Sequence, residues 1–355
     1  MPAGSKTLTL AQIAQHIGAD IVGPFAGALD VGDEITVNGL GSLGSAQPGE
    51  LTHLSGASYR PLLPSTQAGA VILSAEDAVN SPSPCLIVAQ PYLAFARASQ
   101  LFDNSDGFDA GIHPSAVIAP SAEISAAAHI GAHVVIEANV TIESGAVVQA
   151  NCTVGNNSVV GAQTNVFPNV VIYPHVTLGQ RCTVHSGAVL GADGFGFTPD
   201  EKGRFEAIAQ IGGLRIGSDV SIGAGTTIDC GAIDATIIGD GVKIDNLVQI
   251  GHNCKIGDHT LICGAVGLAG STEIGRHCVF AGGSGVAGKN PITICDQVVV
   301  SVKTTVSQSI AKPGIYSGSI LASEHSSWLR NAVKFNALGQ LFKRVKRLED
   351  GIKDE

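Results

Sequence analysis

The chain has 355 residues, of which 14% are charged and 45% are hydrophobic, and its formal net charge is −10. This acidic balance gives no support for nucleic-acid binding, which favours a basic surface, and the low charge argues against disorder. No apolar run reaches the ~20 residues that span a bilayer, and the first residues lack a secretory leader pattern. We therefore expect a cytoplasmic protein with neither a transmembrane segment nor a nucleic-acid partner.

Residues 1–108 predict a small α/β domain. Thr9 and Gln12 have the spacing of a capping box, and Gly18 is placed to end a short helix. The buried face of that helix is expected to consist of Leu10, Ile13, Ala14 and Ile17. Short strands are expected at 51–54, 70–73 and 86–89, followed by a helix over 91–101 and a linker over 103–111.

The middle of the chain carries a six-residue repeat. From Ile118 to Leu190, every sixth residue is a branched aliphatic, thirteen times in succession. So short a period is typical of a parallel β-helix, in which three hexads form one triangular coil and coils stack about 4.8 Å apart. The repeat breaks over 192–214, slips across 231–236 and is disturbed by a two-residue surplus at 289–291. We expect a rigid solenoid over 109–312 that carries an inserted loop.

The eight cysteines include no C-x-x-C pair. Four of them stand two residues before a repeat aliphatic, and positions i and i−2 of a strand share a face. We therefore expect these four to pack inside the prism, with no metal site: Cys152, Cys182, Cys254 and Cys278.

Residues 313–355 predict a helical extension. Apolar and amide residues recur at spacings of three and four, as in a heptad seam: Trp328, Asn331, Phe335, Leu338, Phe342 and Val345. Six basic residues lie between 326 and 348, and two interpretations stay open: a solvated helix face, or a dock for an acidic partner. The basic residues that carry the second interpretation are Lys343, Arg344, Lys346 and Arg347.

Residues 245–253 hold the strongest candidate site. Asp245, Asn246, Gln249, His252 and Asn253 can all hydrogen-bond a sugar or an amide, and alternation along a strand predicts that several share one wall. A histidine that titrates near neutrality is a natural acceptor for the proton of an attacking amine or hydroxyl. Residues 191–196 (GADGFG) match a dinucleotide fingerprint only superficially, because no βαβ unit surrounds them.

Four ordered motifs resemble the UDP-3-O-acylglucosamine N-acyltransferases of lipid A biosynthesis. They are Gly191–Gly196 (GADGFG), Gln210-Ile211-Gly212, Thr226–Asp229 (TTID) and Ile244–Asn253 (IDNLVQIGHN). The order of the three parts of the chain also matches, so the resemblance spans essentially the whole sequence. It implies a left-handed parallel β-helix assembled as a homotrimer, a hand that runs against the usual rule for parallel crossovers.

The resemblance also implies a reaction. An (R)-3-hydroxyacyl chain moves from the thioester of acyl carrier protein to the 2-amine of UDP-3-O-acylglucosamine, and the only prosthetic group involved is the carrier's 4′-phosphopantetheine arm. His252 corresponds to the general base, and the backbone amide of Gly270 to the oxyanion donor. Residues expected to contact the substrate are Asp245, Asn246, Gln249 and Asn253.

In this family the amino-terminal domain stacks uracil between aromatic rings. Here Tyr59 is kept, while His53 and Gly56 stand where a phenylalanine and an asparagine are common. Thr305 stands where some members have a methionine at the floor of the acyl pocket, and Lys289 replaces a second histidine. The acidic carrier protein is expected to dock on the basic residues of the carboxy-terminal helix.

Three other interpretations of the solenoid are weaker. The same fold could acylate or acetylate another sugar nucleotide, but the appended first domain and IDNLVQIGHN argue against it. A metal enzyme resembling γ-type carbonic anhydrases needs an H-x-x-x-x-H pair, whereas His129 and His133 are four apart. An ice-binding solenoid needs flat arrays of threonine, which the interruptions at 192–214 and 289–291 spoil.

Overall fold

The computed structural model describes residues 6–27, 35–103, 107–288, 291–318 and 322–353. The chain divides into two compact units, Met1–Gly107 and Phe108–Glu355. Each unit has its own hydrophobic core and is described by itself here. Among the helices described, none combines the length and the apolar character needed to cross a membrane.

The first unit is built on a five-stranded sheet of order β2-β7-β6-β5-β4, in which only the β2–β7 pair is antiparallel. Strands β1 and β3 form a separate antiparallel pair. The strands are β1 Leu8–Thr9, β2 Asp20–Val22, β3 Thr36–Val37, β4 Gly39–Leu40, β5 Glu50–His53, β6 Ala70–Leu73 and β7 Cys85–Ile87. The helices are α1 Leu10–Ile17, η1 Pro24–Ala26, η2 Ala57–Ser65, α2 Ala75–Ala78 and α3 Pro91–Gln100.

Helix α1 confirms the predicted capping box. The Thr9 hydroxyl accepts the Gln12 N–H (3.1 Å), and the Gln12 side chain accepts the Thr9 N–H (2.9 Å). Gly18 ends the helix with φ 68°, in the left-handed region that glycine enters most easily. The buried face is the predicted one, Leu10, Ile13, Ala14 and Ile17.

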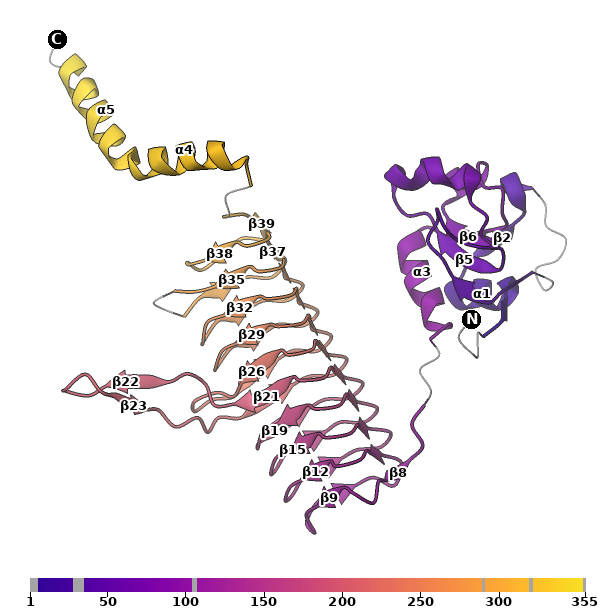
Figure 1. Cartoon of the computed structure of the whole chain (residues 1–355), viewed down its shortest axis with the longest axis horizontal. Helices are drawn as coiled ribbons and strands as arrows, with labels where there is room; N and C mark the ends of the chain where they lie inside the picture. The colour runs from indigo at the N-terminus through magenta and orange to yellow at the C-terminus, as the bar shows by residue number, and fades with distance from the viewer. Residues whose placement is uncertain (1–5, 28–34, 104–106, 289–290, 319–321, 354–355) are drawn as a thin grey trace. The chain divides into compact units, whose positions relative to one another are not determined.

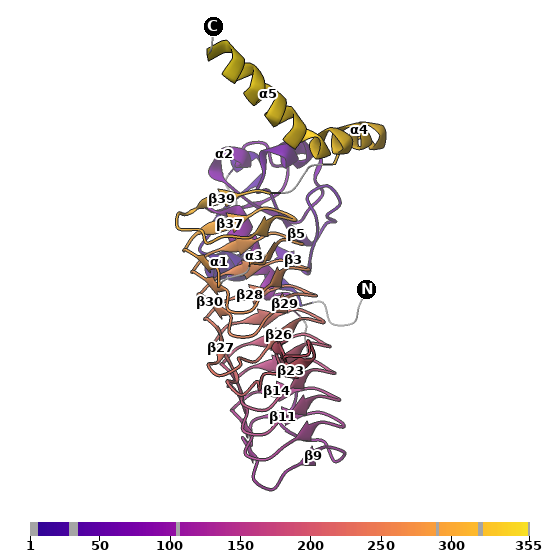
Figure 2. The same cartoon turned by 90° about the vertical axis from the view of Figure 1, so that its left-hand side faces the viewer.

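The second unit is a parallel β-solenoid, which confirms the predicted fold class. Three parallel sheets form the faces of a prism, and each coil contributes one short strand to each face (Figures 1 and 2). After the first coil the hexads place their aliphatic residues inside, as at Ile136, Ile142 and Val148, which are at most 1% exposed. Between strands the chain turns through left-handed residues such as Asn157 and Asn169, because asparagine tolerates positive φ.

The strands of the solenoid fall into three sets. The eleven-stranded sheet holds β8 Gly111–Ile112, β11 His129–Ile130, β14 Val147–Val148, β17 Asn165–Val166, β20 Thr183–Val184, β25 Ser221–Ile222, β28 Lys243–Ile244, β31 Leu261–Ile262, β34 Val279–Phe280, β37 Val298–Val300 and β39 Gly314–Tyr316. The ten-stranded sheet holds β9 Val117–Ile118, β12 Val135–Ile136, β15 Thr153–Val154, β18 Val171–Ile172, β21 Val189–Ala192, β26 Thr227–Asp229, β29 Gln249–Ile250, β32 Gly267–Leu268, β35 Gly285–Val286 and β38 Thr305–Val306. The nine-stranded sheet holds β10 Glu123–Ile124, β13 Thr141–Ile142, β16 Val159–Val160, β19 Val176–Leu178, β24 Leu214–Ile216, β27 Thr236–Ile238, β30 Lys255–Ile256, β33 Glu273–Ile274 and β36 Thr293–Ile294.

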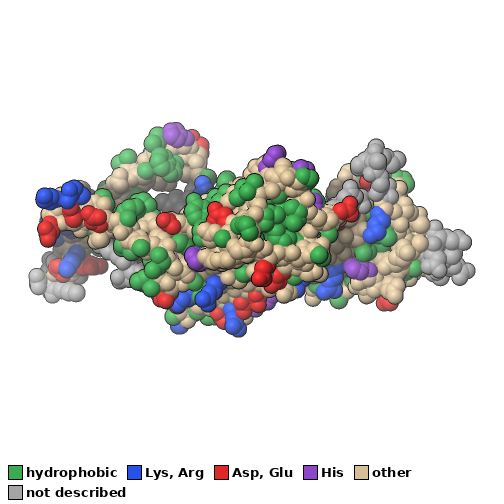
Figure 3. Space-filling view, turned by 90° about the horizontal axis from the view of Figure 1, so that it is seen from below, with side chains coloured by type: hydrophobic (Ala, Val, Ile, Leu, Met, Phe, Trp, Pro, Cys, Tyr) green, Lys and Arg blue, Asp and Glu red, His purple; other side chains and the backbone are tan. Residues whose placement is uncertain are grey.

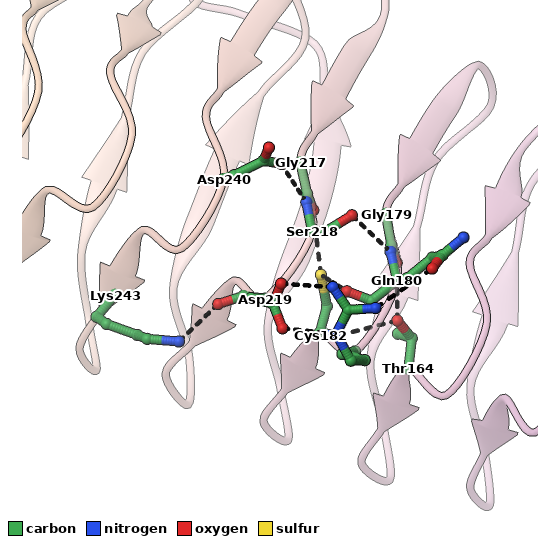
Figure 4. Close-up of polar contacts among 10 residues, drawn as sticks. Thr164, Gly179, Gln180, Cys182, Gly217, Ser218, Asp219, Asp240 and Lys243 are labelled. Carbon is green, nitrogen blue, oxygen red and sulfur yellow. Dashed lines mark hydrogen bonds and ion pairs between the residues drawn. The ribbon is translucent and has the colours of Figure 1, made fainter.

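Side chains from one coil cap the backbone of the next at the corners of the prism. At the corner between the nine- and eleven-stranded sheets, Asp240 accepts the Ser218 N–H (2.7 Å) and the Ser218 hydroxyl accepts the Gln180 N–H (3.3 Å; Figure 4). Lys243 donates to the carbonyl of Asp219 one coil away (2.6 Å). These bonds satisfy amide and carbonyl groups that the tight turns leave unpaired.

The four cysteines that were predicted inside the prism are buried there, with at most 1% exposure. Burial raises the pKa of their thiols, for Cys254 to about 11, because the low-polarity interior disfavours the thiolate. They therefore act as small apolar packing groups.

The predicted loop at 192–214 is a protruding antiparallel hairpin. Its strands are β22 Phe197–Pro199 and β23 Phe205–Ala207, and Figure 1 shows it leaving the prism after β21. No helix follows GADGFG, in agreement with the rejection of a dinucleotide fold. At the end of the solenoid that carries β9, hydrophobic side chains gather on the surface (Figure 3), and Ile112 and Val117 of this end are 51% and 64% exposed.

The carboxy-terminal extension differs from the continuous seam that the heptad spacing predicted. It forms two helices, α4 His325–Asn336 and α5 Leu338–Lys353, separated at Ala337 (Figure 1). Trp328, Phe335 and Phe342 are 47%, 65% and 71% exposed, and Trp328 stacks on His325 of its own helix. Among the described residues no second helix covers the seam, and a heptad pattern is stabilised by a partner helix.

Candidate active site

His252 lies at the corner of the prism that joins β29 to β30. Its Nδ1 is 3.0 Å from Oδ1 of Asn253. That oxygen also accepts the Ala232 N–H (3.1 Å), while Nδ2 of Asn253 donates to the carbonyl of Asp234 (2.7 Å). Because these backbone groups set the amide orientation of Asn253, Nδ1 of His252 is the ring nitrogen that donates to Asn253. In the neutral imidazole this tautomer places the lone pair on Nε2, the form that a general base requires.

Gly270 occupies the same corner position one coil further along. A Cβ on Gly270 would lie 2.7 Å from Nε2 of His252, so the imidazole rests directly against the glycine backbone. At this corner of earlier coils the equivalent amides are capped: Ala138 donates to Asn156 (2.9 Å), and Asn156 donates to Glu137 (3.0 Å). The Gly270 N–H has no such partner among the described residues, which leaves a donor available beside Nε2.

On the ten-stranded sheet beside His252, hydrogen bonds join Thr227, Gln249 and Asp229. Thr227 donates to Oε1 of Gln249, and Nε2 of Gln249 donates to Oδ2 of Asp229 (3.1 Å). Burial raises the pKa of Asp229, and the Gln249 hydrogen bond and the charge of His252 oppose that effect. Asp229 was quoted only as part of the TTID motif and was not predicted as a site residue. Its outward position two residues after Thr227 was the available signal.

Asp245 and Asn246 lie at a different corner, between β28 and β29. The residues of 245–253 that share one wall therefore do not include this pair, because the coil turns between Asn246 and Gln249. The Asp245 carboxylate and the Asn246 amide line a cavity of about 520 Å³, together with His185, Lys243 and Cys263. Asn246 also caps the Ala224 N–H (2.6 Å).

Thr305 lies on the same outward row as Gln249. The register runs from Gln249 through Gly267 and Gly285 to Thr305 on successive strands of the ten-stranded sheet. Neither glycine has a side chain; a Cβ on Gly267 would meet nothing within 4 Å, whereas one on Gly285 would lie 2.9 Å from the carbonyl oxygen of Gly267. The row therefore carries no side chains between Gln249 and Thr305, and we refer to this stretch, Gly267 and Gly285, as the trough.

The root of the β22–β23 hairpin contacts His252. A Cβ on Gly194 would lie 2.5 Å from Cβ of His252 and 2.7 Å from Oε1 of Gln210. Beyond this root, Phe195, Phe197 and Phe205 line a cavity of about 340 Å³. This exposed aromatic group was not predicted, although three phenylalanines within eleven residues of an inserted loop gave a signal for it.

In the first unit, His53 ends β5 and stacks on Phe95 of α3, with ring centroids 4.1 Å apart. Tyr92 lies 5.5 Å from the His53 ring. Tyr59 is 58% exposed in η2 and lies over Gly56. The structure thus pairs His53 with Phe95 and Tyr92, two aromatic residues that sequence reasoning did not select. Burial lowers the pKa of His53, which favours a neutral ring suited to stacking.

The basic side chains of α5 are exposed on neighbouring positions of one helix. We refer to Lys343, Arg344, Lys346 and Arg347 as the α5 basic patch. Lys289 lies outside the described residues. Within the part of the chain that is described, no three His, Cys, Asp or Glu side chains gather as a metal-binding group.

Comparison with known proteins matches both units. The model of the UDP-3-O-(3-hydroxymyristoyl) glucosamine N-acyltransferase family, LpxD, matches residues 34–101. A GMPPB C-terminal domain model matches residues 112–194, and a bacterial transferase hexapeptide model matches residues 235–268.

Two curated relatives and one solved structure are similar over long stretches. A UDP-3-O-acylglucosamine N-acyltransferase of Shewanella denitrificans is 55% identical over 96% of this chain and 97% of the relative. One of Pseudomonas aeruginosa is 48% identical over 96% of this chain and 94% of the relative. The crystal structure of Arabidopsis UDP-N-acetylglucosamine acyltransferase superposes with a TM-score of 0.51 at 25% identity, covering 59% of this chain and 71% of that one.

Proposed function

The chain belongs to the family of UDP-3-O-acylglucosamine N-acyltransferases, and on that premise we propose how it performs acyl transfer. The donor is a 3-hydroxyacyl thioester on the 4′-phosphopantetheine arm of acyl carrier protein. The acceptor is the 2-amine of UDP-3-O-acylglucosamine. The observation that carries the proposal is one corner of the prism, where Nε2 of His252 and the N–H of Gly270 are adjacent and neither is paired with any residue that the structure describes.

His252 acts as the general base in this proposal. The amine attacks the thioester carbon and loses a proton to Nε2, which then returns it to the departing thiolate. Asn253 supports this role because it accepts the Nδ1–H (3.0 Å) and so selects the neutral tautomer whose lone pair is on Nε2. General-base assistance of this kind is worth about 10²–10⁴ in rate.

Gly270 supplies the oxyanion donor. Attack on the thioester moves a pair of electrons onto the carbonyl oxygen, and a fixed N–H beside the reacting carbon stabilises that charge. The free amide of Gly270 next to Nε2 supports this assignment. Glycine leaves the imidazole in this position, whereas a Cβ would displace it.

A homotrimer is part of the proposal because one chain divides the candidate residues between two corners. Asp245 and Asn246 line their own cavity, while His252 and Gly270 lie across the β29 face. A three-fold arrangement of prisms sets the Asp245 corner of one subunit against the His252 corner of the next. The acceptor sugar would then be held by Asp245 and Asn246 of one subunit and reach the base of its neighbour.

The trough above Gln249 is the proposed path of the transferred acyl chain. Gly267 and Gly285 leave room for methylene groups, and Thr305 closes the row three strands away. A threonine is shorter than a methionine, so this floor lies deeper than in family members with methionine. Chain length is therefore expected to depend on residue 305.

Two further contacts complete the proposal. His53, stacked on Phe95, and the exposed ring of Tyr59 hold the uracil of the acceptor. The α5 basic patch docks the acidic carrier protein, for which its exposed positive charges are suited.

Mass spectrometry of the reaction product tests the proposed function. The purified protein is supplied with UDP-3-O-acylglucosamine and with carrier proteins bearing 3-hydroxyacyl chains of increasing length. A product heavier by one hydroxyacyl group, attached at nitrogen, is the expected result. Absence of product across the whole series, from correctly folded protein, would mean that the acceptor is a different sugar nucleotide.

A further inference from the structure

Asp229 is a carboxylate beside the base that the proposed mechanism does not use. It is the last residue of β26, on the coil before that of His252. Its register partner on β21 is Ala192, and the register of β26 with β29 places Gly251 at the equivalent position on the following coil. Because it follows the inward-facing Ile228, its side chain points outward on the same face as Thr227. The carboxylate therefore lies on the outer surface of the ten-stranded sheet, toward the corner that carries His252.

The orientation of Asp229 is held by one of its two oxygens. Oδ2 accepts Nε2 of Gln249 at 3.1 Å, and the other end of that amide is held by Thr227. The second oxygen, Oδ1, has no partner among the described residues and is not buried. Asp229 thus presents one free acceptor, in a fixed direction, beside the base.

Asp229 is partly shielded from water. Its side chain is half-buried, and burial raises its pKa, against the Gln249 hydrogen bond and the charge of His252. A carboxylate in such a setting interacts strongly with an incoming cation, because less water screens the pair. The neighbouring Cys230 is buried, and burial raises the pKa of its thiol, as do the charges of Asp193 and Asp229 to a smaller extent.

Attack by an amine creates a cation at this place. The nitrogen lone pair forms the C–N bond, the C=O pair moves onto oxygen, and nitrogen carries a full positive charge until a proton leaves. The proton then passes to Nε2 of His252, and the C–S bond breaks with the thiol as leaving group. A hydroxyl nucleophile differs, because its single proton is transferred to the base as the C–O bond forms.

We propose that Asp229 is a catalytic residue that binds the acceptor amine through Oδ1 and stabilises the positive nitrogen of the tetrahedral intermediate. It acts opposite the Gly270 amide, which stabilises the negative oxygen of the same species. This inference rests on the proposed function and deepens it, since it makes the site selective for an amine over a hydroxyl acceptor.

Asp229→Asn is the test variant, because asparagine keeps the acceptor for Gln249 and removes only the charge. We expect the kcat for UDP-3-O-acylglucosamine to fall 10- to 100-fold, the range for losing a charged partner in a transition state. The inhibition constant of the 2-hydroxyl analogue, UDP-3-O-acylglucose, should change less than threefold. Glu273→Gln, which neutralises an exposed carboxylate of the nine-stranded sheet, is the matched control and should leave both values unchanged.

A second comparison separates a direct role from one that acts through the imidazole. Asp229→Asn is also introduced into His252→Ala, and the slow residual transfer is followed by mass spectrometry. If Asp229 acts on the nitrogen, the residual rate falls again by a similar factor. No further loss in that background, or a kcat for Asp229→Asn within threefold of wild type, would overturn the proposal.

Two controls keep the test interpretable. Thermal melting and size measurements show whether Asp229→Asn folds and assembles as wild type does, and Asp229→Ser replaces it if it does not. Equal weakening of the hydroxyl analogue and the amine acceptor would indicate a structural role and would also count against the proposal. Failure of the proposed function is distinct, because the wild-type protein would then form no N-acylated product.

Discussion

Replacing Gly270 by alanine should disable the site without unfolding the protein. The new Cβ would lie 2.7 Å from Nε2, 2.8 Å from Cε1 and 3.0 Å from Cδ2 of His252. The closest approach is about 0.7 Å less than the 3.4 Å at which ordinary contacts begin, so the imidazole must move by nearly that much. The coil itself tolerates the methyl group, since Ala138 holds the equivalent corner several coils earlier.

A displacement approaching 1 Å at a reacting group costs about 10²-fold in rate. We therefore expect kcat for Gly270→Ala to fall about 100-fold, while the melting temperature shifts by only a few degrees because the half-exposed ring of His252 can yield. The assay is steady-state acyl transfer with both substrates saturating, alongside a thermal melt.

The double variant Gly270→Ala/His252→Ala supplies the control for this reasoning. Removing the imidazole removes the collision, so the melting temperature should return to that of His252→Ala alone. Turnover of Gly270→Ala within threefold of wild type would refute the argument, as would a loss of turnover explained by unfolding.

Three other predictions address the remaining parts of the molecule. Tyr59→Ala should raise the KM for the UDP sugar more than it lowers kcat, because stacking on uracil is largely uniform binding; an unchanged KM would remove Tyr59 from the nucleotide site. Reversing the charges of the α5 basic patch should weaken binding of acyl carrier protein at low salt and matter less at high salt; equal affinity at low salt would favour the solvated-face interpretation. Hydrogen bonds from the Ser326 side chain and from the amides of Ser326 and Ser327 lower the pKa of Glu324, the N-cap of α4, from 4.5 to about 2. A lowered carboxyl pKa stabilises the folded form above the unfolded value, so this contribution is complete above about pH 4.5 and is lost as pH falls toward 2; Glu324→Gln should flatten that dependence in helix content measured by circular dichroism.

The repeat predicted the fold well because one physical rule generates it. A branched aliphatic at every sixth position must be buried, and only a coil of short strands buries all of them on one axis. The same reasoning identified the interior cysteines and the interruption at 192–214 as a loop. It did not predict that the loop is a hairpin with exposed phenylalanines, because the strand pattern of β22 and β23 is only three residues long.

The site was harder to predict because sequence neighbours separate at a corner. Asp245 and Gln249 are four residues apart, yet a turn at Asn246 and Leu247 places them on different faces. Conversely, His252 and Gly270 are eighteen residues apart and meet because one coil contains eighteen residues. Sequence reasoning missed Asp229 for a related reason. The interruption of the repeat at 231–236 lies between Asp229 and His252, so the eighteen-residue spacing of successive coils does not relate these two positions.

The carboxy-terminal segment is helical as predicted, but the heptad spacing did not predict its division into two helices. Spacings of three and four from Trp328 to Val345 describe a seam, but a seam needs a partner to keep the helix straight. With none among the described residues, the helix divides at Ala337 before Gly339. The left-handed coil is a prediction of the family resemblance alone, since a six-residue period is the same for either hand.

The most direct test of the account is the turnover of His252→Ala, measured with saturating acyl carrier protein thioester and UDP-3-O-acylglucosamine. The variant should keep the assembly state and melting temperature of wild type while kcat falls by about 10²–10⁴, the range for loss of a general base. A kcat close to that of wild type, in a variant that is correctly folded, would contradict the assignment of His252 as the base.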